Sequence, residues 1–355
     1  MRSVPRRSSF LSFVLLSVAI AAFVTWRWMH IYVDSPMPLS EPLVFVVEPG
    51  STLKAVARGL AARGALEHPR VWVAHARLHG LAKSIRAGEY RIEPGATPAS
   101  VLEKLVKGDV ILREITILEG WAFRDLMHAI DQHPALEHSL KGASAAEVME
   151  RIGSPGVHPE GQFFPDTYRF SGGTRDLDLL RKAHEALRTR LQAAWEARAE
   201  GLPLESAYEA LTLASIVEKE TGLASERPRI AGVFVRRLRL GMRLQSDPTV
   251  IYGIGASYDG NIRRRDLLAD SPYNTYTRRG LPPTPIALPG EGALRAATQP
   301  DDSGALFFVA TGDPDGSHYF SKTLTEHNAA VKRLLARQRA RAATADAQPT
   351  GTNAR

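Results

Sequence analysis

The sequence predicts an α+β protein with an N-terminal transmembrane helix, a small α+β subdomain and a larger mixed α/β domain. Three observations predict this class. One uncharged, apolar segment lies near the N-terminus. Behind it, a short apolar run, a Pro-Gly turn and a helical pattern occur twice in succession. Farther on, apolar residues recur at helical spacing, and the 355 residues leave room for two or three small domains.

The apolar segment is typical of a membrane anchor. Its uncharged part, Phe10–Trp26, is about as long as the shortest helices that cross a bilayer. Arginines precede it, so residues 1–28 should form a cytoplasmic N-terminus and a single transmembrane helix, with the rest of the chain exported. The alternative is a cleaved signal peptide, because Ala19-Ile20-Ala21 fits a small-x-small cleavage site. We favour the anchor because the apolar run continues beyond that site.

The chain is basic and carries no cysteine. Its formal net charge is +7 and its pI is about 9.7, which suits nucleic acid, anionic lipid or an anionic polymer as a partner. We expect no nucleic-acid partner, because the sequence has no ladder of aromatic and basic residues and no zinc-finger spacing. The absence of cysteine excludes disulfides, thiolate metal sites and a cysteine nucleophile.

A proline-containing segment, residues 29–42, is expected to be an extended linker. The small subdomain follows at residues 43–109. In it, the order strand, Pro-Gly turn, Ser or Thr, helix occurs first from Leu43–Val47 and again from Tyr90-Arg91-Ile92. This duplication resembles a LysM-like carbohydrate-binding module, although a generic small α+β domain contains the same elements.

The larger domain is expected at residues 110–336, and a basic, disordered tail at residues 337–355. Its predicted elements follow the spacing of apolar residues. They are a strand at Val110–Leu118, mainly helical structure at residues 121–152, helices from Thr174 to about Ala199, from near Leu204 to Gly222 and from Ser225 to Gly241, and a strand at Leu306–Thr311.

A carboxylate lies near the end of the most apolar helical run of this domain. Glu218 belongs to the segment LTLASIVEKET, residues 211–221. Burial against its small and apolar neighbours would raise the pKa of the carboxyl group, as a general acid at neutral pH requires. The alternative is a solvent-facing glutamate paired with Lys219 or Arg227. Glu220 faces away from Glu218 on a helix and is not expected to be essential.

Two later segments carry side chains that suit sugars. Gln245, Ser246 and Asp247 begin the run QSDPT, and Asn274 and Tyr276 belong to the run YNTY. Amides and hydroxyls can pair with the N-acetyl and hydroxyl groups of a sugar, and aromatic rings suit its C–H faces. We therefore predict these five residues as substrate contacts. The alternatives are structural: Asp247 as the N-cap of a helix that begins at the next proline, and a β-turn with packed tyrosines.

Other candidates receive weaker predictions. Four residues of EGQFFPDTYRF could border the same cleft, although packing explains the phenylalanines better: Phe163, Phe164, Asp166 and Tyr168. We expect no metal, because His318 and His327 lack a ligand pattern around them. Ser215 is not expected to be a nucleophile, because no G-x-S-x-G motif surrounds it.

Seven segments together resemble one known family. In order, they read EGQFFPDTY, LASIVEKET, RLGMRLQSDPTVIYG, SPYNTY, GLPPTPI, PGEGAL and HYFSKTLTEHN. They are similar to the motifs of the endolytic murein transglycosylases of the MltG (YceG-like) family. The resemblance runs from the membrane segment to about Leu335, which is nearly the whole chain.

The resemblance implies a function and a cellular setting. Enzymes of this family cleave the MurNAc-GlcNAc bond within nascent peptidoglycan strands, leave 1,6-anhydroMurNAc ends and so terminate elongation. It implies an inner-membrane anchor, a LysM-like subdomain and a periplasmic catalytic domain, here residues 110–336. The implied partners are glycan strands and the inner membrane, with peptidoglycan synthases as further candidates, and no cofactor or metal is implied. The catalytic acid of the family motif falls on Glu218.

Two other functions stay open from the residues. The chain could be a non-catalytic glycan-binding scaffold of the envelope. It could also be a true hydrolase with a second carboxylate, such as Asp247 or Asp166. A transglycosylase needs no second carboxylate, because the sugar's own C6 hydroxyl replaces water and one glutamate can act as acid and then as base.

Overall fold

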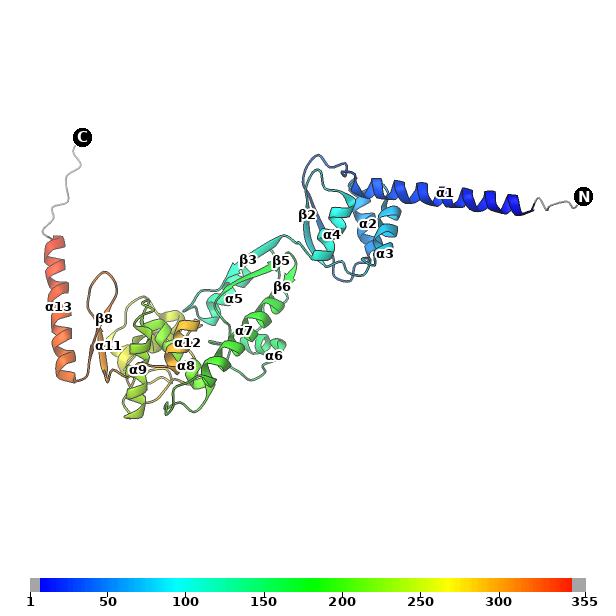
Figure 1. Ribbon diagram of the computed structural model, residues 1–355. Coiled ribbons are helices and arrows are strands. Elements are labelled where there is room, and N and C mark those ends of the chain that lie inside the picture. The colour runs from blue at the N-terminus through cyan, green and yellow to red at the C-terminus, as the bar shows by residue number, and fades with distance from the viewer. Residues whose placement is uncertain (1–6, 347–355) are drawn as a thin grey trace, which may run out of the picture. The chain divides into compact units, whose positions relative to one another are not determined.

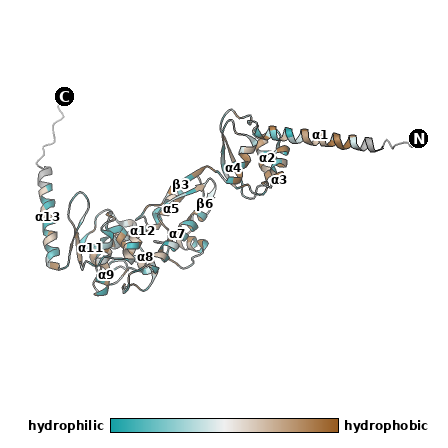
Figure 2. Cartoon of the chain, viewed as in Figure 1, coloured by the Kyte–Doolittle hydropathy of each residue, from teal (hydrophilic) through white to brown (hydrophobic). Residues whose placement is uncertain are grey.

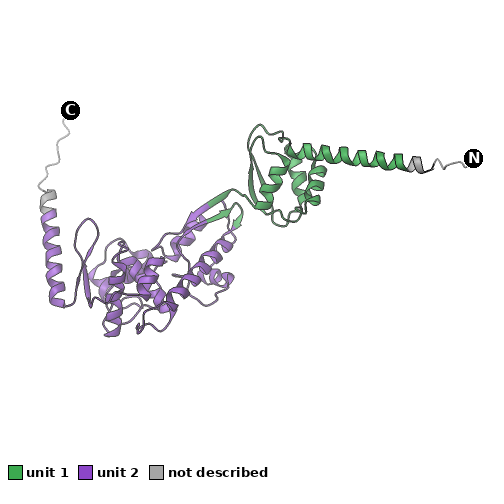
Figure 3. Ribbon diagram, in the orientation of Figure 1, with its two compact units in different colours: residues 1–113, 169–174 green, residues 114–168, 175–355 purple. Residues whose placement is uncertain are grey.

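A computed structural model of the chain describes residues 7–346, with burial described for residues 12–341. The chain divides into two compact units (Figure 3). The first comprises residues 1–113 and 169–174, and the second comprises residues 114–168 and 175–355. Helices and short strands are mixed along the chain, as the predicted α+β class requires.

Helix α1 (Arg7–Asp34) contains the predicted apolar segment (Figure 1). Among the described residues, one helical stretch, Ser12–Asp34, is long and apolar enough to cross a membrane. Figure 2 shows hydrophobic, brown turns along α1. Large side chains of this stretch, among them Phe13 and Phe23, are more than half exposed. An exposed apolar surface of this kind marks a contact with lipid or with another protein.

The segment 29–42 is not the extended linker that was expected. α1 continues through its first part as far as Asp34, and the Tyr32 hydroxyl accepts a hydrogen bond from the His68 N–H at 3.0 Å. Three of its side chains are buried in the first unit: Met29, Val33 and Met37. The helix continues because one of its faces is covered by this unit. A chain shortened to begin near Ser40 would therefore lose part of the unit's core.

The first unit is built on a two-stranded antiparallel sheet. Its remaining elements are β1 (Leu43–Val47), α2 (Leu53–Ala62), α3 (Pro69–Leu78), β2 (Gly88–Ile92) and α4 (Pro98–Lys107). Phe45 of β1 pairs with Tyr90 of β2, and both side chains are buried against the helices. Trp72 of α3 is also buried and donates from its ring nitrogen to the Pro98 carbonyl at 2.7 Å.

The predicted duplication is present in the structure of this unit. Thr52 caps α2 and Thr97 caps α4, each with an extended backbone and a hydroxyl that accepts from the N–H three residues on. The Pro-Gly turns before them end in left-handed glycines, Gly50 at φ +78° and Gly95 at φ +84°. The two copies of the strand–turn–helix order thus share their turn and capping geometry.

The second unit is mainly helical. Its helices are α5 (Phe123–Asp131), α6 (Ala145–Ile152), α7 (Asp176–Glu196), α8 (Ala207–Glu220), α9 (Arg227–Arg239), α10 (Asp247–Ile254), the short η1 (Gly255–Ser257), α11 (Arg264–Leu268), α12 (Glu291–Thr298) and α13 (Leu324–Asp346). Outside the β1–β2 sheet, the strands form two-stranded pairings: β3 (Leu112–Thr116) with β5 (Thr167–Ser171), β4 (Leu136–Glu137) with β6 (Thr174–Arg175), and β7 (Phe307–Ala310) with β8 (His318–Ser321). Strands β3, β5 and β6 contain residues of both units.

Three predicted helix starts were a few residues early. Thr174 lies in β6, so α7 begins at Asp176. Ser206 caps α8, which therefore begins after the apolar Leu204, and α9 begins at Arg227 rather than next to Ser225. In each case a strand or a local cap determines the boundary, and apolar spacing alone does not indicate it.

The expected disordered tail is also partly wrong, because α13 continues to Asp346. Arg337 donates to the Thr311 carbonyl at 3.0 Å, and Arg341 donates to the Gly312 carbonyl at 2.6 Å. These contacts attach the helix to the loop after β7, although the segment has no apolar periodicity. Residues 347–355 of the predicted tail lie outside the described residues.

Candidate active site

Helix α8 positions the predicted acid. The Ser206 hydroxyl caps its first turn by accepting from the Glu209 N–H at 3.2 Å. Every residue from Ala210 to Val217 is buried, so this stretch has no polar face and forms the centre of the unit's core. Glu218 is the first residue after the buried stretch. Its carboxyl group therefore leaves the core at the C-terminal end of the helix.

The Glu218 carboxyl group is held by two donors. Its side chain is 5% exposed. One oxygen accepts from Arg227 Nη2 at 2.8 Å, and the other accepts from the Gly290 N–H at 2.9 Å. The same Arg227 nitrogen donates to Glu119 Oε2 at 3.0 Å. One guanidinium group is thus shared by two carboxyl groups.

Burial raises the pKa of Glu218 above its ordinary value. The Gly290 N–H and the positive charge of Arg227 act in the opposite direction, and the nearby carboxylate of Glu119 adds to the rise. A carboxyl group with a raised pKa can donate a proton. Two donors are in place for the ionised form that remains, and the raised pKa makes this carboxylate a better base than an ordinary one, so that the same group can accept a proton afterwards.

Two glycines of the PGEGAL motif make room for this arrangement. A side chain at Gly290 would overlap the Glu119 carboxyl group, and one at Gly292 would meet the Arg227 guanidinium at 2.5 Å. Gly290 is also the N-cap of α12, so its N–H is not used inside the helix. The motif therefore supplies a donor to Glu218 and the space in which its neighbours lie.

The geometry of Glu218 has features of both interpretations, the acid beside apolar residues and the glutamate paired with a cation. Arg227 does pair with it, as the alternative expected, but only 5% of the Glu218 side chain is exposed, so it does not face solvent. Glu220 points elsewhere, as predicted: its carboxyl group accepts from the Ser246 hydroxyl at 2.5 Å. Burial raises the pKa of Glu220 to about 7. Glu220 thus connects the end of α8 to the QSDPT segment.

Two of the five predicted substrate contacts are used inside the protein. Ser246 is buried, donates to Glu220 and is the N-cap of α10, a place that the sequence assigned to Asp247. Asn274 is buried, and its Oδ1 accepts from the Tyr276 N–H at 2.9 Å. Its amide nitrogen donates to three carbonyl groups, those of Asp266, Leu267 and Ala269. The geometry gives these two side chains a structural role.

The other three predicted contacts reach the surface. Gln245 and Asp247 are exposed, and Tyr276 is half-buried with its hydroxyl donating to Asp247 at 2.5 Å. Gln245 has φ +52° and is the one non-glycine residue with positive φ in the described part of the chain. A bond from its N–H to the Thr275 carbonyl at 3.1 Å holds this conformation. Backbone strain of this kind concentrates at functional sites.

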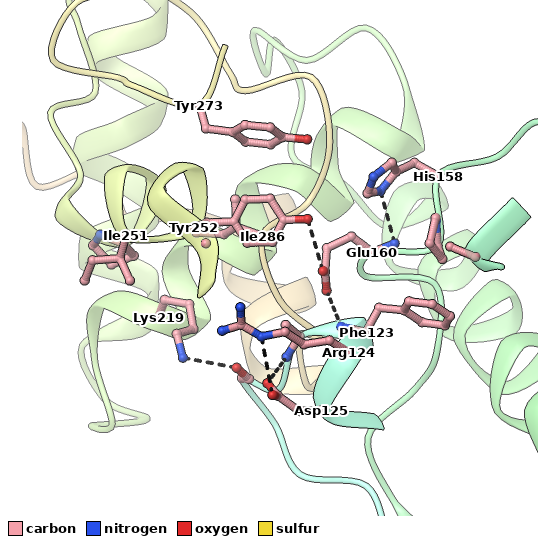
Figure 4. Close-up of a pocket in the computed structure, with 16 residues that line it drawn as sticks. Phe123, Arg124, Asp125, His158, Glu160, Lys219, Ile251, Tyr252, Tyr273 and Ile286 are labelled. Atoms are coloured by element: carbon pink, nitrogen blue, oxygen red, sulfur yellow. Dashed lines mark hydrogen bonds and ion pairs between the residues drawn. The ribbon is translucent and has the colours of Figure 1, made fainter. Parts of the chain in front are cut away.

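A pocket of about 460 Å³ adjoins this region. Figure 4 shows Glu160 and Phe123 on one side of it, Lys219, the neighbour of Glu218, on the other, and the Tyr252 ring pointing toward Glu160. The buried Glu160 accepts from the Phe123 N–H at 2.9 Å and from the Tyr252 hydroxyl at 3.1 Å. Burial raises the pKa of Glu160 to about 7. A carboxyl group that titrates near neutral pH thus lies in the wall of the pocket.

We expect the Glu160→Gln substitution to change stability in a pH-dependent way. The pKa of Glu160 is about 7 in the folded protein, against an ordinary 4.5, so the folded state binds this proton more tightly than the unfolded state. The resulting stability is complete below the ordinary value and is lost as the pH rises through 7. Glutamine stays neutral at every pH. Between about pH 5 and about pH 8, the free energy of unfolding of the variant should therefore rise by roughly 2–3 kcal/mol relative to that of the wild type. Thermal unfolding of both proteins across this range measures the gain, and a constant difference would contradict it.

Several weaker candidates have structural roles. Phe163, Phe164 and Tyr168 are buried, as packing predicted for the phenylalanines. Ser215 donates to the Thr212 carbonyl at 2.7 Å and accepts from the Ile286 N–H at 2.9 Å, which fixes the segment before Gly290. In the described part of the chain, no cluster of three or more His, Cys, Asp or Glu residues could hold a metal ion; His318 instead pairs with Glu226 at 2.7 Å.

Three parts of the Glu218 environment do not follow from the sequence pattern. No pattern singles out Glu119, Arg227 is expected only as the partner of a solvent-facing Glu218, and Gly290 stands out only as part of the PGEGAL motif. The available signal was glycine spacing, because Gly290 and Gly292 flank a single residue at a helix start. Such a pair indicates that other groups approach the backbone closely. Glu160 does not stand out in the sequence, because it is the first residue of the aromatic segment EGQFFPDTYRF, which is typical of packing.

A carboxyl side chain with a raised pKa and two donors for its ionised form, next in sequence to Lys219 in the pocket wall, has the arrangement of a general acid–base centre. The chain belongs to the YceG-like family, whose model matches residues 45–333. This confirms the family that the seven motifs indicated.

Two relatives are named endolytic murein transglycosylases, in agreement with this assignment. The endolytic murein transglycosylase of Bacillus subtilis strain 168 is 30% identical over an alignment of 303 positions, which covers 81% of this chain and 83% of that protein. The endolytic murein transglycosylase of Streptococcus pneumoniae serotype 2 strain D39 is 26% identical over an alignment of 359 positions, which covers 90% of this chain but only 63% of the pneumococcal protein. A crystal structure of a putative YceG-like protein from Listeria monocytogenes is 27% identical, with a TM-score of 0.49, over 81% of this chain and 98% of that one.

Proposed function

We propose that the protein is a membrane-anchored endolytic lytic transglycosylase that cleaves the MurNAc-GlcNAc bond within nascent peptidoglycan strands. The observation that carries this proposal is Glu218, a buried carboxyl group whose pKa is raised and whose ionised form has two donors in place. The names of the relatives support murein as the substrate and transglycosylation as the reaction.

In the proposed reaction, Glu218 gives its proton to the glycosidic oxygen as the bond to the anomeric carbon of MurNAc breaks. Arg227 and the Gly290 N–H then hold the carboxylate that this transfer leaves. The C6 hydroxyl of the same MurNAc attacks its anomeric carbon, and Glu218 takes up the hydroxyl proton. The products are a 1,6-anhydroMurNAc end and a free GlcNAc hydroxyl, and no water is consumed.

Glu119 does not have the position of a hydrolase's second carboxylate. In glycoside hydrolases the two carboxyl groups lie on either side of the scissile bond. Here Glu119 and Glu218 both accept from a single nitrogen of Arg227, so they lie together around one cation. This arrangement favours one acid–base residue and a nucleophile that belongs to the sugar.

Substrate contacts are proposed on the surface-reaching residues only. Gln245, Asp247 and Tyr276 present an amide, a carboxylate and a phenol at the same loop cluster, whereas Ser246 and Asn274 support that cluster from inside. In the first unit, the order β1–α2–α3–β2 with its capped turns supports a LysM-like role in holding glycan.

The anchor and its orientation are part of the same proposal. The length and apolar surface of α1 support a single inner-membrane span, and the arginines at the N-terminus favour a cytoplasmic start with both units in the periplasm. An enzyme confined there would meet strands as they are made. Cleavage inside such strands would end their elongation.

The products of digestion test this function. The full chain in detergent should release internal glycan fragments from purified peptidoglycan, and mass spectrometry should find new ends that are one water lighter than reducing ends. Reducing ends in their place would indicate a hydrolase. No cleavage by a folded protein would favour the glycan-binding scaffold.

A further inference from the structure

The segment around Glu119 is fixed against α8 and against the segment that precedes α12. The Gly120 N–H donates to the Leu288 carbonyl at 2.9 Å, and the Leu288 N–H donates to the Trp121 carbonyl at 2.7 Å. Lys219 Nζ adds a bond to the Gly120 carbonyl at 3.1 Å. The backbone that carries Glu119 is therefore attached to the helix that carries Glu218 and to the segment that leads to Gly290. The position of the Glu119 carboxyl group follows from these bonds.

We propose that Glu119 is a positioning residue that shares Arg227 with Glu218 and thereby controls how strongly this cation holds the ionised acid. The inference rests on the proposed function of Glu218. Its observation is the pair of bonds from one Arg227 nitrogen, at 2.8 Å to Glu218 and 3.0 Å to Glu119. The absent side chain of Gly290 is the second observation, because only glycine leaves room there for the Glu119 carboxyl group.

The charged groups around Glu218 come from three directions. Arg227 reaches it from the start of α9, and Glu119 reaches Arg227 from the segment before α5. The start of α12 contributes the Gly290 N–H, while Glu291 beside it is exposed. On α8 itself, the neighbours are directed elsewhere, Lys219 to a carbonyl oxygen and Glu220 to a serine hydroxyl. Arg227 and Glu119 are thus the opposing charges that act on the acid.

This arrangement has a chemical use. While Glu218 is protonated, Glu119 alone neutralises Arg227. After Glu218 has given up its proton, Arg227 is shared between two carboxylates, so neither binds it as strongly as a single partner would. Glu218 can therefore remain a proton donor at higher pH than an unshared pair with arginine would allow, and it still has a counter-ion for its ionised form.

The test is the pH profile of the Glu119→Gln variant. Glutamine removes the charge, so Arg227 would pair with Glu218 alone and lower its pKa. We expect the alkaline limb of kcat/KM on soluble, uncrosslinked glycan strands to move down by about one pH unit, with a loss of about tenfold above the limb and little change below it. Glu119→Asp, which keeps the charge, should restore most of the wild-type profile.

A second variant displaces Glu119 without removing it. Gly290→Ala adds a methyl group where the Glu119 carboxyl group lies, and the flexible end of that side chain can move away. The Gly290 backbone angles suit alanine, and the N–H to Glu218 is kept, so this variant should show the same downward shift. The control is Asp302→Asn, which removes an exposed carboxylate beside a different arginine, Arg236, and should leave the profile unchanged.

The outcomes separate this inference from the proposed function. All measurements use the full chain in detergent. If the wild type cleaves glycan but the Glu119→Gln profile coincides with it, or drops by the same factor at every pH, the inference is wrong and the function stands. If the folded wild type does not cleave glycan at all, the proposed function itself fails.

Discussion

The Glu218→Gln variant should lose glycan cleavage while it keeps its fold. Glutamine has nearly the same volume and can still accept from Arg227 or from the Gly290 N–H, but it cannot deliver a proton. General acid–base groups contribute about 10²–10⁴-fold to a rate, and here one residue would serve both proton transfers. We therefore expect a loss at or beyond the upper end of that range. Initial rates of release from purified glycan measure it.

A matched control separates chemistry from folding. Glu185→Gln makes the same change at a glutamate of α7 that is exposed and paired with Arg188, and it should leave the rate unchanged. The circular dichroism spectrum and glycan binding of Glu218→Gln should resemble those of the wild type. Activity within tenfold of the wild type would contradict the assignment of Glu218.

The Arg227→Met variant should show the second large effect. Arg227 is 12% exposed and holds two carboxyl groups, of which Glu218 is buried. Removing one partner of a buried ion pair costs about 3–5 kcal/mol, because the remaining charge has no compensation. The lost cation should also raise the pKa of Glu218 and make it a weaker acid. We expect a lower melting temperature, a slower reaction and an alkaline limb at higher pH.

The upward shift of the alkaline limb in Arg227→Met is opposite in direction to the shift expected for Glu119→Gln. The two variants together therefore test whether Arg227 sets the pKa of Glu218. Arg227→Lys keeps a positive charge and should return the alkaline limb toward the wild type. Unaltered stability together with an unaltered pH profile in Arg227→Met would show that this cation does not control Glu218.

Features that depend on neighbouring residues could be predicted well. The strand Leu43–Val47 and a Ser or Thr cap after each Pro-Gly turn were predicted because turn glycines, caps and apolar spacing are local signals. Glu218 was predicted for the same reason: a carboxylate at the end of an apolar helical run is visible in eleven consecutive letters of the sequence, residues 211–221. Its burial follows from the residues beside it.

Features that depend on distant residues could not be predicted. Glu119 and Arg227 are 108 positions apart, and Glu218 and Gly290 are 72 positions apart, so no local pattern connects them. The same reason explains the errors. The segment 29–42 is ordered by burial in the first unit, and the basic end of α13 is ordered by bonds to the loop after β7. Composition indicated a linker and a disordered tail, but tertiary contacts hold both segments in helical or buried conformations.

In the proposed reaction, the sugar's own hydroxyl, and not water, completes the step started by Glu218. Digestion of peptidoglycan by the full chain in ¹⁸O-labelled water distinguishes the two nucleophiles. We expect 1,6-anhydroMurNAc ends without label, and a rate that a chelator does not reduce. Label at the new ends, with masses one water heavier, would show that water is the nucleophile and that the enzyme is a hydrolase.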